Sequence, residues 1–113
     1  MRALQRNKRV EAYATATASL TATAVIPVTV GPSWEVKQIS VSATGSTTQS
    51  SASTYVGTNS SGVFISSTLI ANSDTDSTPN VTLRSGESLC CIWTKVSSGS
   101  VCKLTIVYDE VGY

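Results

Sequence analysis

The first quarter of the chain alternates small apolar residues with hydroxylated ones. Over residues 12–26 the odd positions from 13 to 23 carry only Tyr, Thr or Ser. A period of two predicts a β-strand with one buried and one exposed side, and the Thr residues, restricted at χ1, favour a strand over the helix that Ala prefers. The side expected to be buried consists of Ala12, Ala14, Ala16, Ala18, Leu20, Ala22, Ala24 and Ile26.

Two interpretations of this segment are open. A single strand over 12–26 would be far longer than the usual strand of ~5–6 residues, so about half of it would extend beyond its own domain. We would then expect it to cross onto a neighbouring subunit and add to that subunit's sheet through main-chain hydrogen bonds. The alternative, given equal weight, is two ordinary strands with a bend near Leu20.

The remainder of the chain is a series of strand patterns separated by Gly- and Ser/Thr-rich turns, with no helical period. In "SWEVKQISVSA", 33–43, the apolar positions change phase, which predicts a β-bulge near Lys37 and Gln38. Turn signals every eight to twelve residues are typical of sandwiches and small barrels. We therefore predict an all-β chain folded as a single β-sandwich, of jelly-roll or immunoglobulin-like type, with an extended N-terminal arm.

The last third contains two strand patterns, "SLCCIWTKV" and "VCKLTIVYDE", joined by "SSGS". This arrangement predicts a β-hairpin. If Val96 pairs with Val101, Trp93 lies opposite Leu104 on one continuous apolar face. Trp93, and Trp34 in the earlier strand, are expected to anchor the core.

The three cysteines, Cys90, Cys91 and Cys102, are expected to be free thiols. An odd number fits a reducing compartment better than a disulfide framework. In the expected hairpin, Cys102 lies beyond disulfide reach of Cys90 and Cys91, and these two neighbours point to opposite faces of their strand. We interpret all three as small apolar side chains.

The composition argues against catalysis. The chain has 113 residues, enough for one domain, with 13% charged residues and no histidine, so the commonest general base and metal ligand is absent from the sequence. Asp74 and Asp76 are spaced like the start of a calcium loop but lack its Gly and closing Glu. We predict that the protein is no enzyme and has no metal site and no cofactor. No apolar run approaches the ~18 residues of a membrane span, and Glu11 interrupts what would be the apolar part of a signal peptide.

Positive charge is concentrated at the N-terminus. The net charge is only +1, yet Arg2, Arg6, Lys8 and Arg9 are half of the eight basic residues. We divide the chain into a basic N-terminal arm, 1–11, and a β-sandwich domain, 12–113. Such an arm is typical of contacts with nucleic acid or an acidic protein surface, or is simply solvated; nucleic acid is the less expected partner here. The predicted partner-binding residues are Arg2, Arg6, Lys8 and Arg9, together with Ala14, Ala16, Ala18 and Leu20 of the strand that follows.

Three stretches give the chain a resemblance to a known group of proteins. They are "SWEVKQISVSA", "STYVG" and "TLRSGESLCCIWTKVSSGSVCKLTIVYDEV". Residues 33–111 resemble the small β-sandwich virion proteins of tailed bacteriophages, which have a Trp-led core strand, a short "VYVG"-like strand and an "L-x-x-G-E-x-L-x-x-x-W" strand pair. That last element is carried here by Leu83, Gly86, Glu87, Leu89 and Trp93.

The resemblance implies a structural role in a virion assembled in the host cytoplasm. The first expectation is a capsid decoration or cement protein that binds the assembled shell. Its partners would be the major capsid protein or other virion subunits, and it would itself form a homo-oligomer, with a trimer favoured. The alternative is a minor tail or tail-tip protein that contacts host surface glycans through loops 44–51 and 71–80.

Overall fold

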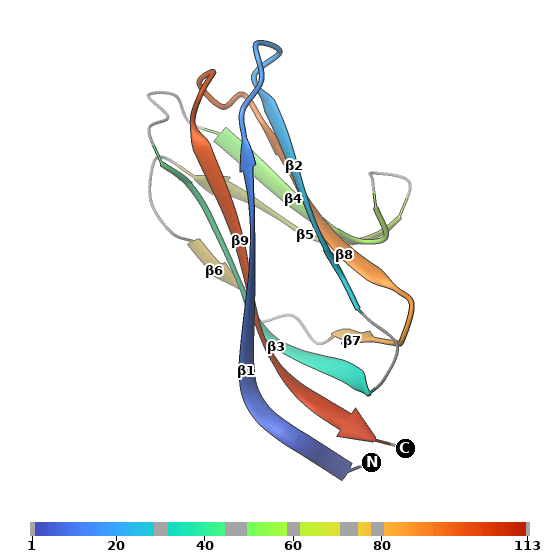
Figure 1. The fold of residues 1–113 in the computed structure, drawn as a ribbon. Helices are drawn as coiled ribbons and strands as arrows, with labels where there is room; N and C mark the ends of the chain where they lie inside the picture. Colours follow the sequence, from blue (N-terminus) through green and yellow to red (C-terminus); the bar gives the residue numbers. More distant parts are fainter. Residues whose placement is uncertain are drawn as a thin grey trace.

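The computed structural model describes the backbone of residues 2–28, 32–44, 50–58, 62–70, 75–77 and 81–112, and the side chains of residues 8–28, 32–44, 50–58, 62–65 and 81–111. Within these ranges the regular secondary structure is entirely β (Figure 1). The strands are β1 (Arg2–Thr15), β2 (Thr21–Pro27), β3 (Ser33–Thr44), β4 (Ser50–Val56), β5 (Val63–Ile70), β6 (Thr75–Ser77), β7 (Val81–Leu83), β8 (Ser88–Thr94) and β9 (Val101–Gly112).

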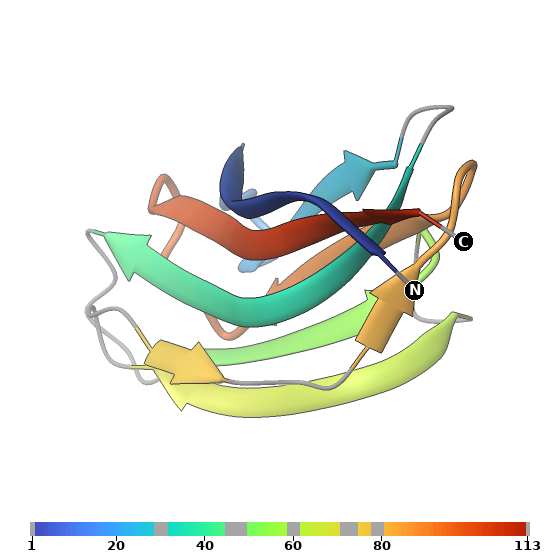
Figure 2. The same ribbon diagram turned by 90° about the horizontal axis from the view of Figure 1, so that it is seen from below.

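The strands form two antiparallel sheets. One sheet has the order β1-β9-β3-β6, with β7 also paired to β3, and the other has the order β2-β8-β4-β5. Figure 2 shows the two layers facing each other, with β3 and β9 in one and β4, β5 and β8 in the other. The expected all-β sandwich is confirmed.

The path of the chain between the sheets is that of a jelly roll. The chain changes sheet at every step from β1 to β4, stays in one sheet for the paired strands β4 and β5, and changes sheet again from β5 to β6, from β7 to β8 and from β8 to β9. Nested crossings of this kind are typical of the double Greek key. Of the two sandwich types left open by the sequence, the topology therefore selects the jelly roll.

The basic segment expected to be a separate arm is extended, and it belongs to the sandwich. β1 pairs with β9 from Arg2 opposite Gly112 to Thr15 opposite Val101, with two register shifts between Ala3 and Lys8. The pairing satisfies backbone N–H and C=O groups that would otherwise need water. The boundary expected between residues 11 and 12 therefore falls inside a strand, and β1 is the edge strand of its sheet.

The continuous strand expected over 12–26 is wrong, and the alternative of two strands with a bend near Leu20 is confirmed. β1 ends at Thr15 and β2 begins at Thr21. Thr17 N–H donates to Thr21 O and Leu20 N–H donates to Thr17 O, both at 2.9 Å, and Leu20 has a positive φ of 64°. The turn lets both strands bury their even-numbered sides in the core of their own chain.

The hairpin expected from the last two strands is also wrong. β8 pairs with β2 and β4, so Trp93 lies opposite Ala22 and Ala52, whereas Leu104 in β9 lies opposite Ala12 and Val41. β8 and β9 meet across the core between the two sheets. A hairpin and two facing strands bury the same apolar residues, so the hydrophobic pattern alone does not separate them.

Other expectations about the core are confirmed. Trp93 is 0% exposed, and Trp34 is buried with its ring stacked on Tyr108 at a centroid distance of 4.0 Å. A register shift between Val36 and Gln38 marks the expected β-bulge in β3. None of the three cysteines forms a disulfide, and all three are buried.

We predict that Trp93→Ala lowers the free energy of unfolding by about 3–5 kcal/mol, because it leaves a cavity at the centre of the core. Trp93→Phe should cost less, since it keeps an aromatic ring and removes an indole N–H that has no hydrogen-bond partner among the described residues. Denaturant unfolding measures both. Tyr13→Ala, at an aromatic side chain that is 63% exposed, is the control; a loss as large as that of Trp93→Ala would contradict the assignment of the core.

We also predict that stability falls as the pH rises from 9 to 11. Burial raises the pKa of the Cys102 thiol from 9.0 to about 11 and raises that of Cys91 as well. In this range unfolded thiols release protons that the folded protein retains, so the unfolded state gains stability with pH. Unfolding midpoints at a series of pH values should show a shallower decline for Cys102→Ala than for the parent protein. Equal slopes would show that Cys102 titrates normally in the folded state.

Candidate functional site

The predicted basic residues lie along β1. The backbones of Arg2 and Arg6 are in this strand, while their side chains lie outside the described residues. Lys8 Nζ is 3.3 Å from Glu110 Oε1, and Arg9 Nε is 3.8 Å from Glu11 Oε1. Arg9 is therefore an exposed cation and Lys8 a partly buried one, and each already has a carboxylate partner in the chain.

The predicted apolar contact residues fall into two groups. Ala14 packs against the core and Ala16 is only 5% exposed, so their side chains face the chain's own core. These two side chains are thus used by the chain's own core, and their contact with a neighbouring subunit stays a prediction. Ala18 and Leu20 lie in the exposed turn between β1 and β2, and Leu20 is 45% exposed.

The turn that carries Leu20 is tied to the connection between β8 and β9. Ala16 N–H donates to Ser100 O at 2.9 Å, Gly99 N–H donates to Ala16 O at 3.0 Å, and Val96 N–H donates to Leu20 O at 3.1 Å. These backbone bonds hold the two turns together at one end of the sandwich. Ala18 and Leu20 are thus presented on a supported turn, away from the basic half of β1.

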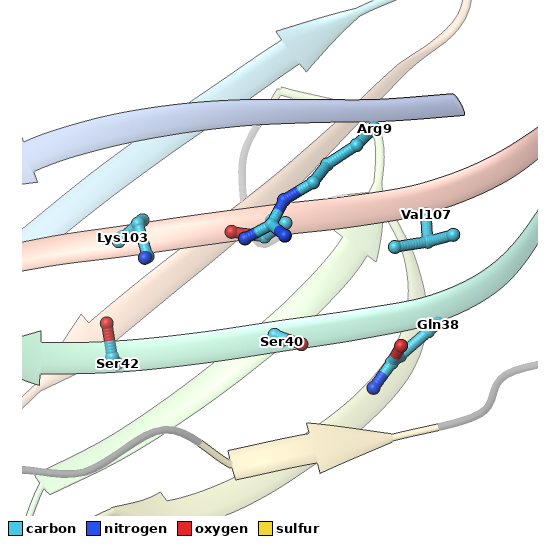
Figure 3. Close-up of a pocket in the computed structure, with 7 residues that line it drawn as sticks. Arg9, Gln38, Ser40, Ser42, Lys103 and Val107 are labelled. Carbon is cyan, nitrogen blue, oxygen red and sulfur yellow. The ribbon is translucent and has the colours of Figure 1, made fainter. Parts of the chain in front are cut away.

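The outer face of the β1-β9-β3 sheet contains a polar hollow of about 230 Å³. Its residues come from all three strands, and Figure 3 shows Arg9 reaching from β1 across β9, with Ser40 and Ser42 on β3. The lining consists of Arg9, Gln38, Ser40, Ser42, Lys103, Thr105 and Val107. We call this feature the outer-face hollow.

Strand register explains why the sheet is hollowed here. In the middle row, Thr105 of β9 lies between Glu11 of β1 and Ser40 of β3. The row on one side holds Lys103 and Ser42, and the row on the other holds Arg9, Val107 and Gln38. Short hydroxylated side chains in the centre, with longer side chains around them, leave a depression in the face.

The electrostatics of the outer-face hollow depend on one carboxylate between two cations. Glu11 Oε1 is 3.8 Å from Arg9 Nε, and Glu11 Oε2 is 3.7 Å from Lys103 Nζ. Charge-assisted hydrogen bonds are usually ~2.7–2.9 Å long, so both contacts are loose ion pairs. Arg9, Glu11 and Lys103 together leave one net positive charge beside the hollow.

Thr105 supplies a buried hydroxyl without a partner. The residue is 3% exposed, and its Oγ1 is buried without a hydrogen bond within the described part of the chain. Because its neighbours Leu104 and Ile106 are in the core, the alternation of the strand directs Thr105 to the outer face. A buried unpaired hydroxyl is unfavourable for folding, so this position is costly unless something binds to it.

The sequence indicated Arg9 but not the rest of the outer-face hollow. Small hydroxylated residues on the polar phase of "KQISVSA" and "CKLTIVY" are the signal that was present. Combining the two segments requires knowing that β9 lies between β1 and β3, which short-range patterns do not provide.

Two further expectations, the absence of a metal site and the glycan-contacting loops, are not tested by the described residues. Among them there is no group of three or more His, Cys, Asp or Glu side chains placed to hold a metal ion. No helix long and apolar enough to cross a membrane occurs in the same part of the chain. Residues 45–49, 71–74 and 78–80, which form most of loops 44–51 and 71–80, lie outside the described residues.

Comparison of the sequence with protein families and with curated proteins gives no match. Solved structures do match. A chain of the acidic stable capsid of Helicobacter pylori bacteriophage KHP30 matches with a TM-score of 0.58 and 14% identity, over 96% of each chain. A family 6 carbohydrate-binding module matches with a TM-score of 0.51 and 8% identity, over 98% of this chain and 92% of that one. PirA matches with a TM-score of 0.51 and 12% identity, over 88% and 92%.

At these identities the matches show a shared fold and assign no activity. β-Sandwiches of this type occur in a bacteriophage capsid and in carbohydrate-binding modules. The chain is therefore a jelly-roll β-sandwich whose structural neighbours include a phage capsid chain.

We predict that Thr105→Val leaves the free energy of unfolding unchanged or raises it by about 1–2 kcal/mol, because a methyl group replaces a buried hydroxyl that has no partner in the described part of the chain. Ser50→Ala is the matched control, since Ser50 is buried and its Oγ donates to Lys95 O at 3.3 Å; its removal should cost about 1 kcal/mol. Denaturant unfolding measures the free energy of unfolding of both variants. A loss of stability for Thr105→Val equal to that for Ser50→Ala would show that the Thr105 hydroxyl supports the fold.

Proposed function

We propose that this chain is a structural protein of a bacteriophage virion, that it decorates the capsid by binding the assembled shell, and that it is not an enzyme. The observation that carries the proposal is the match to a chain of the KHP30 capsid over 96% of both chains. Equal coverage means that the two chains are of about the same length. The match therefore extends over nearly all of this sequence and of that capsid chain.

The sequence supports the same role independently. The strand and turn pattern of residues 33–111 resembles that of small virion proteins of tailed phages. Three residues of the motif behind this resemblance, Leu83, Leu89 and Trp93, are fully buried. These residues determine how the sandwich packs. A role in which the protein serves as a rigid body bound to a larger surface needs such packing and no reactive group.

The described surface favours docking through the face of the β1-β9-β3 sheet over addition of β1 to another sheet. Charged side chains on an edge strand oppose edge-to-edge pairing, and β1 carries Lys8, Arg9 and Glu11. The same side chains suit ion pairs with a partner, and exposed pairs of this kind give specificity and association rate more than affinity. The proposed partners are the major capsid protein or other virion subunits, with a homo-oligomer, a trimer favoured, as the bound form.

A second function has one observation in its favour. The fold is shared with carbohydrate-binding modules, and the outer-face hollow is lined by hydroxyl, amide and cationic groups. A tail or tail-tip protein that contacts host glycans would use such a surface. We rank it second because the capsid chain matches at a higher TM-score.

Binding to capsids tests the proposed function. Capsids assembled from the major capsid protein of the same genome, without this chain, are mixed with the purified protein and sedimented. We expect saturable co-sedimentation with assembled shells and none with unassembled capsid subunits, and light scattering of the free protein gives its oligomeric state.

Absence of binding to shells would contradict the decoration role. A glycan array screened with the same preparation then separates the two candidates. Saturable binding to a glycan together with no binding to shells would establish the second function.

A further inference from the structure

The outer-face hollow is lined by a buried hydroxyl that makes no hydrogen bond to the described residues and by two cations in loose ion pairs. Thr105 Oγ1 has no partner among the described residues, and the ion pairs of Arg9 and Lys103 with Glu11 are 3.8 and 3.7 Å long. Each of these groups can donate a further hydrogen bond. The outer-face hollow thus combines one buried hydroxyl that has no partner among the described residues with two cations that are only loosely paired.

We propose that the outer-face hollow is a carboxylate-binding site that receives an Asp or Glu side chain from a capsid subunit, held by Arg9, Lys103 and the Thr105 hydroxyl. This inference rests on the proposed function and names the contact through which the shell would be bound. Arg9 was expected from the sequence to meet acidic groups, whereas Lys103 and Thr105 are added by the structure.

Glu11 shows that the two cations suit a carboxylate. Its two oxygens face the two cations, one each, so the separation of Arg9 and Lys103 matches the two oxygens of a single carboxyl group. Glu11 comes from the edge strand and lies beside the hollow without being part of its lining. A carboxylate that enters from outside would lie above Thr105 and replace Glu11 as the partner of one or both cations.

The surroundings favour a carboxylate over a neutral sugar. Sugar sites usually present an aromatic face for stacking. The exposed aromatic side chain nearest in register is Tyr13, opposite Lys103, and its hydroxyl donates to Glu11 Oε2 at 3.2 Å. The ring of Tyr13 is outside the lining of the hollow, and two of the seven lining residues are cations, which complement a negative charge.

The size of the outer-face hollow also fits a side chain. Its volume of about 230 Å³ is below the ~300–1,000 Å³ of typical small-molecule pockets. Its lining comes from β9 and β3, which are paired on both sides, and from the edge strand β1. The sheet register therefore fixes the backbone positions that carry the donors. The capsid partner therefore needs only one acidic residue on an exposed loop.

Nuclear magnetic resonance titration with a model peptide tests the site directly. The probe is acetyl-Gly-Glu-Gly-amide, and the control probe is acetyl-Gly-Gln-Gly-amide at the same low ionic strength, because salt screens exposed charges. We expect the Glu peptide, and not the Gln peptide, to shift the amide signals of residues 40–42 and 103–107 saturably. Equal shifts with both peptides, or none, would overturn the carboxylate site.

Substitution of a donor should weaken binding of the Glu peptide, whereas substitution of the competing carboxylate of Glu11 should strengthen it. Arg9→Gln and Lys103→Gln should each weaken Glu-peptide binding by about two- to five-fold, the effect of one exposed ion pair. Thr105→Val should weaken binding by a similar factor while leaving stability unchanged or higher. Lys37→Gln is the matched control, since Lys37 is a cation on the same sheet that pairs with Glu35 and Asp109 outside the hollow, and it should leave binding unchanged.

Glu11→Gln is the decisive variant. Removal of the internal carboxylate should tighten Glu-peptide binding by about two- to five-fold, because it frees both cations. If Glu11 instead accepts hydrogen bonds from a bound sugar, the same change weakens binding of the ligand. Weaker or unchanged binding by Glu11→Gln would contradict the proposal.

The same variants in the capsid assay separate this inference from the proposed function. If the parent protein binds shells and Arg9→Gln, Lys103→Gln and Thr105→Val bind them several-fold more weakly than Lys37→Gln does, the site is the docking contact. If the variants bind shells as the parent does, the docking site is elsewhere and the decoration role stands. If the parent does not bind shells, the decoration role fails, whatever the peptide shows.

Discussion

The fold depends above all on the burial of one apolar face of each sheet against the other. β8 contributes Trp93 from one sheet and β9 contributes Leu104 and Ile106 from the other, all fully buried. Alanines on β1 and β2 allow these edge strands to close over the larger side chains. Because both inner faces are used by the core, any partner must be recognised by an outer face, an edge or a turn.

The sequence showed the period-two pattern of the strands but did not show which strands pair with one another. Alternation along 12–26, the bulge between Val36 and Gln38 and the burial of both tryptophans followed from local patterns. The turn at Leu20 was only one of two alternatives, because an uncharged Ala/Thr run gives no clear stop signal and a non-Gly residue with positive φ is uncommon. The hairpin was wrong because facing sheets and paired strands bury the same residues. The outer-face hollow needed the register of three strands distant in sequence.

The central position of β9 links the core to the proposed binding surface. Its even-numbered residues, such as Leu104, enter the core, while Lys103 and Thr105 face outward between β1 and β3. Packing on the inner side therefore fixes the geometry on the outer side, as a preorganised site requires. At Thr105 stability and the proposed binding oppose each other, since a buried hydroxyl without a partner among the described residues disfavours folding and would gain one from the proposed carboxylate.

Electron cryo-microscopy of a capsid assembled with the protein shows directly whether it docks through the outer face of the β1-β9-β3 sheet. We predict density for the jelly roll on the shell surface, with the β1-β9-β3 face toward the capsid subunit and an acidic side chain between Arg9 and Lys103. Shells without this density, or density in which the β4-β5 side faces the shell and the outer-face hollow is open to solvent, would contradict it.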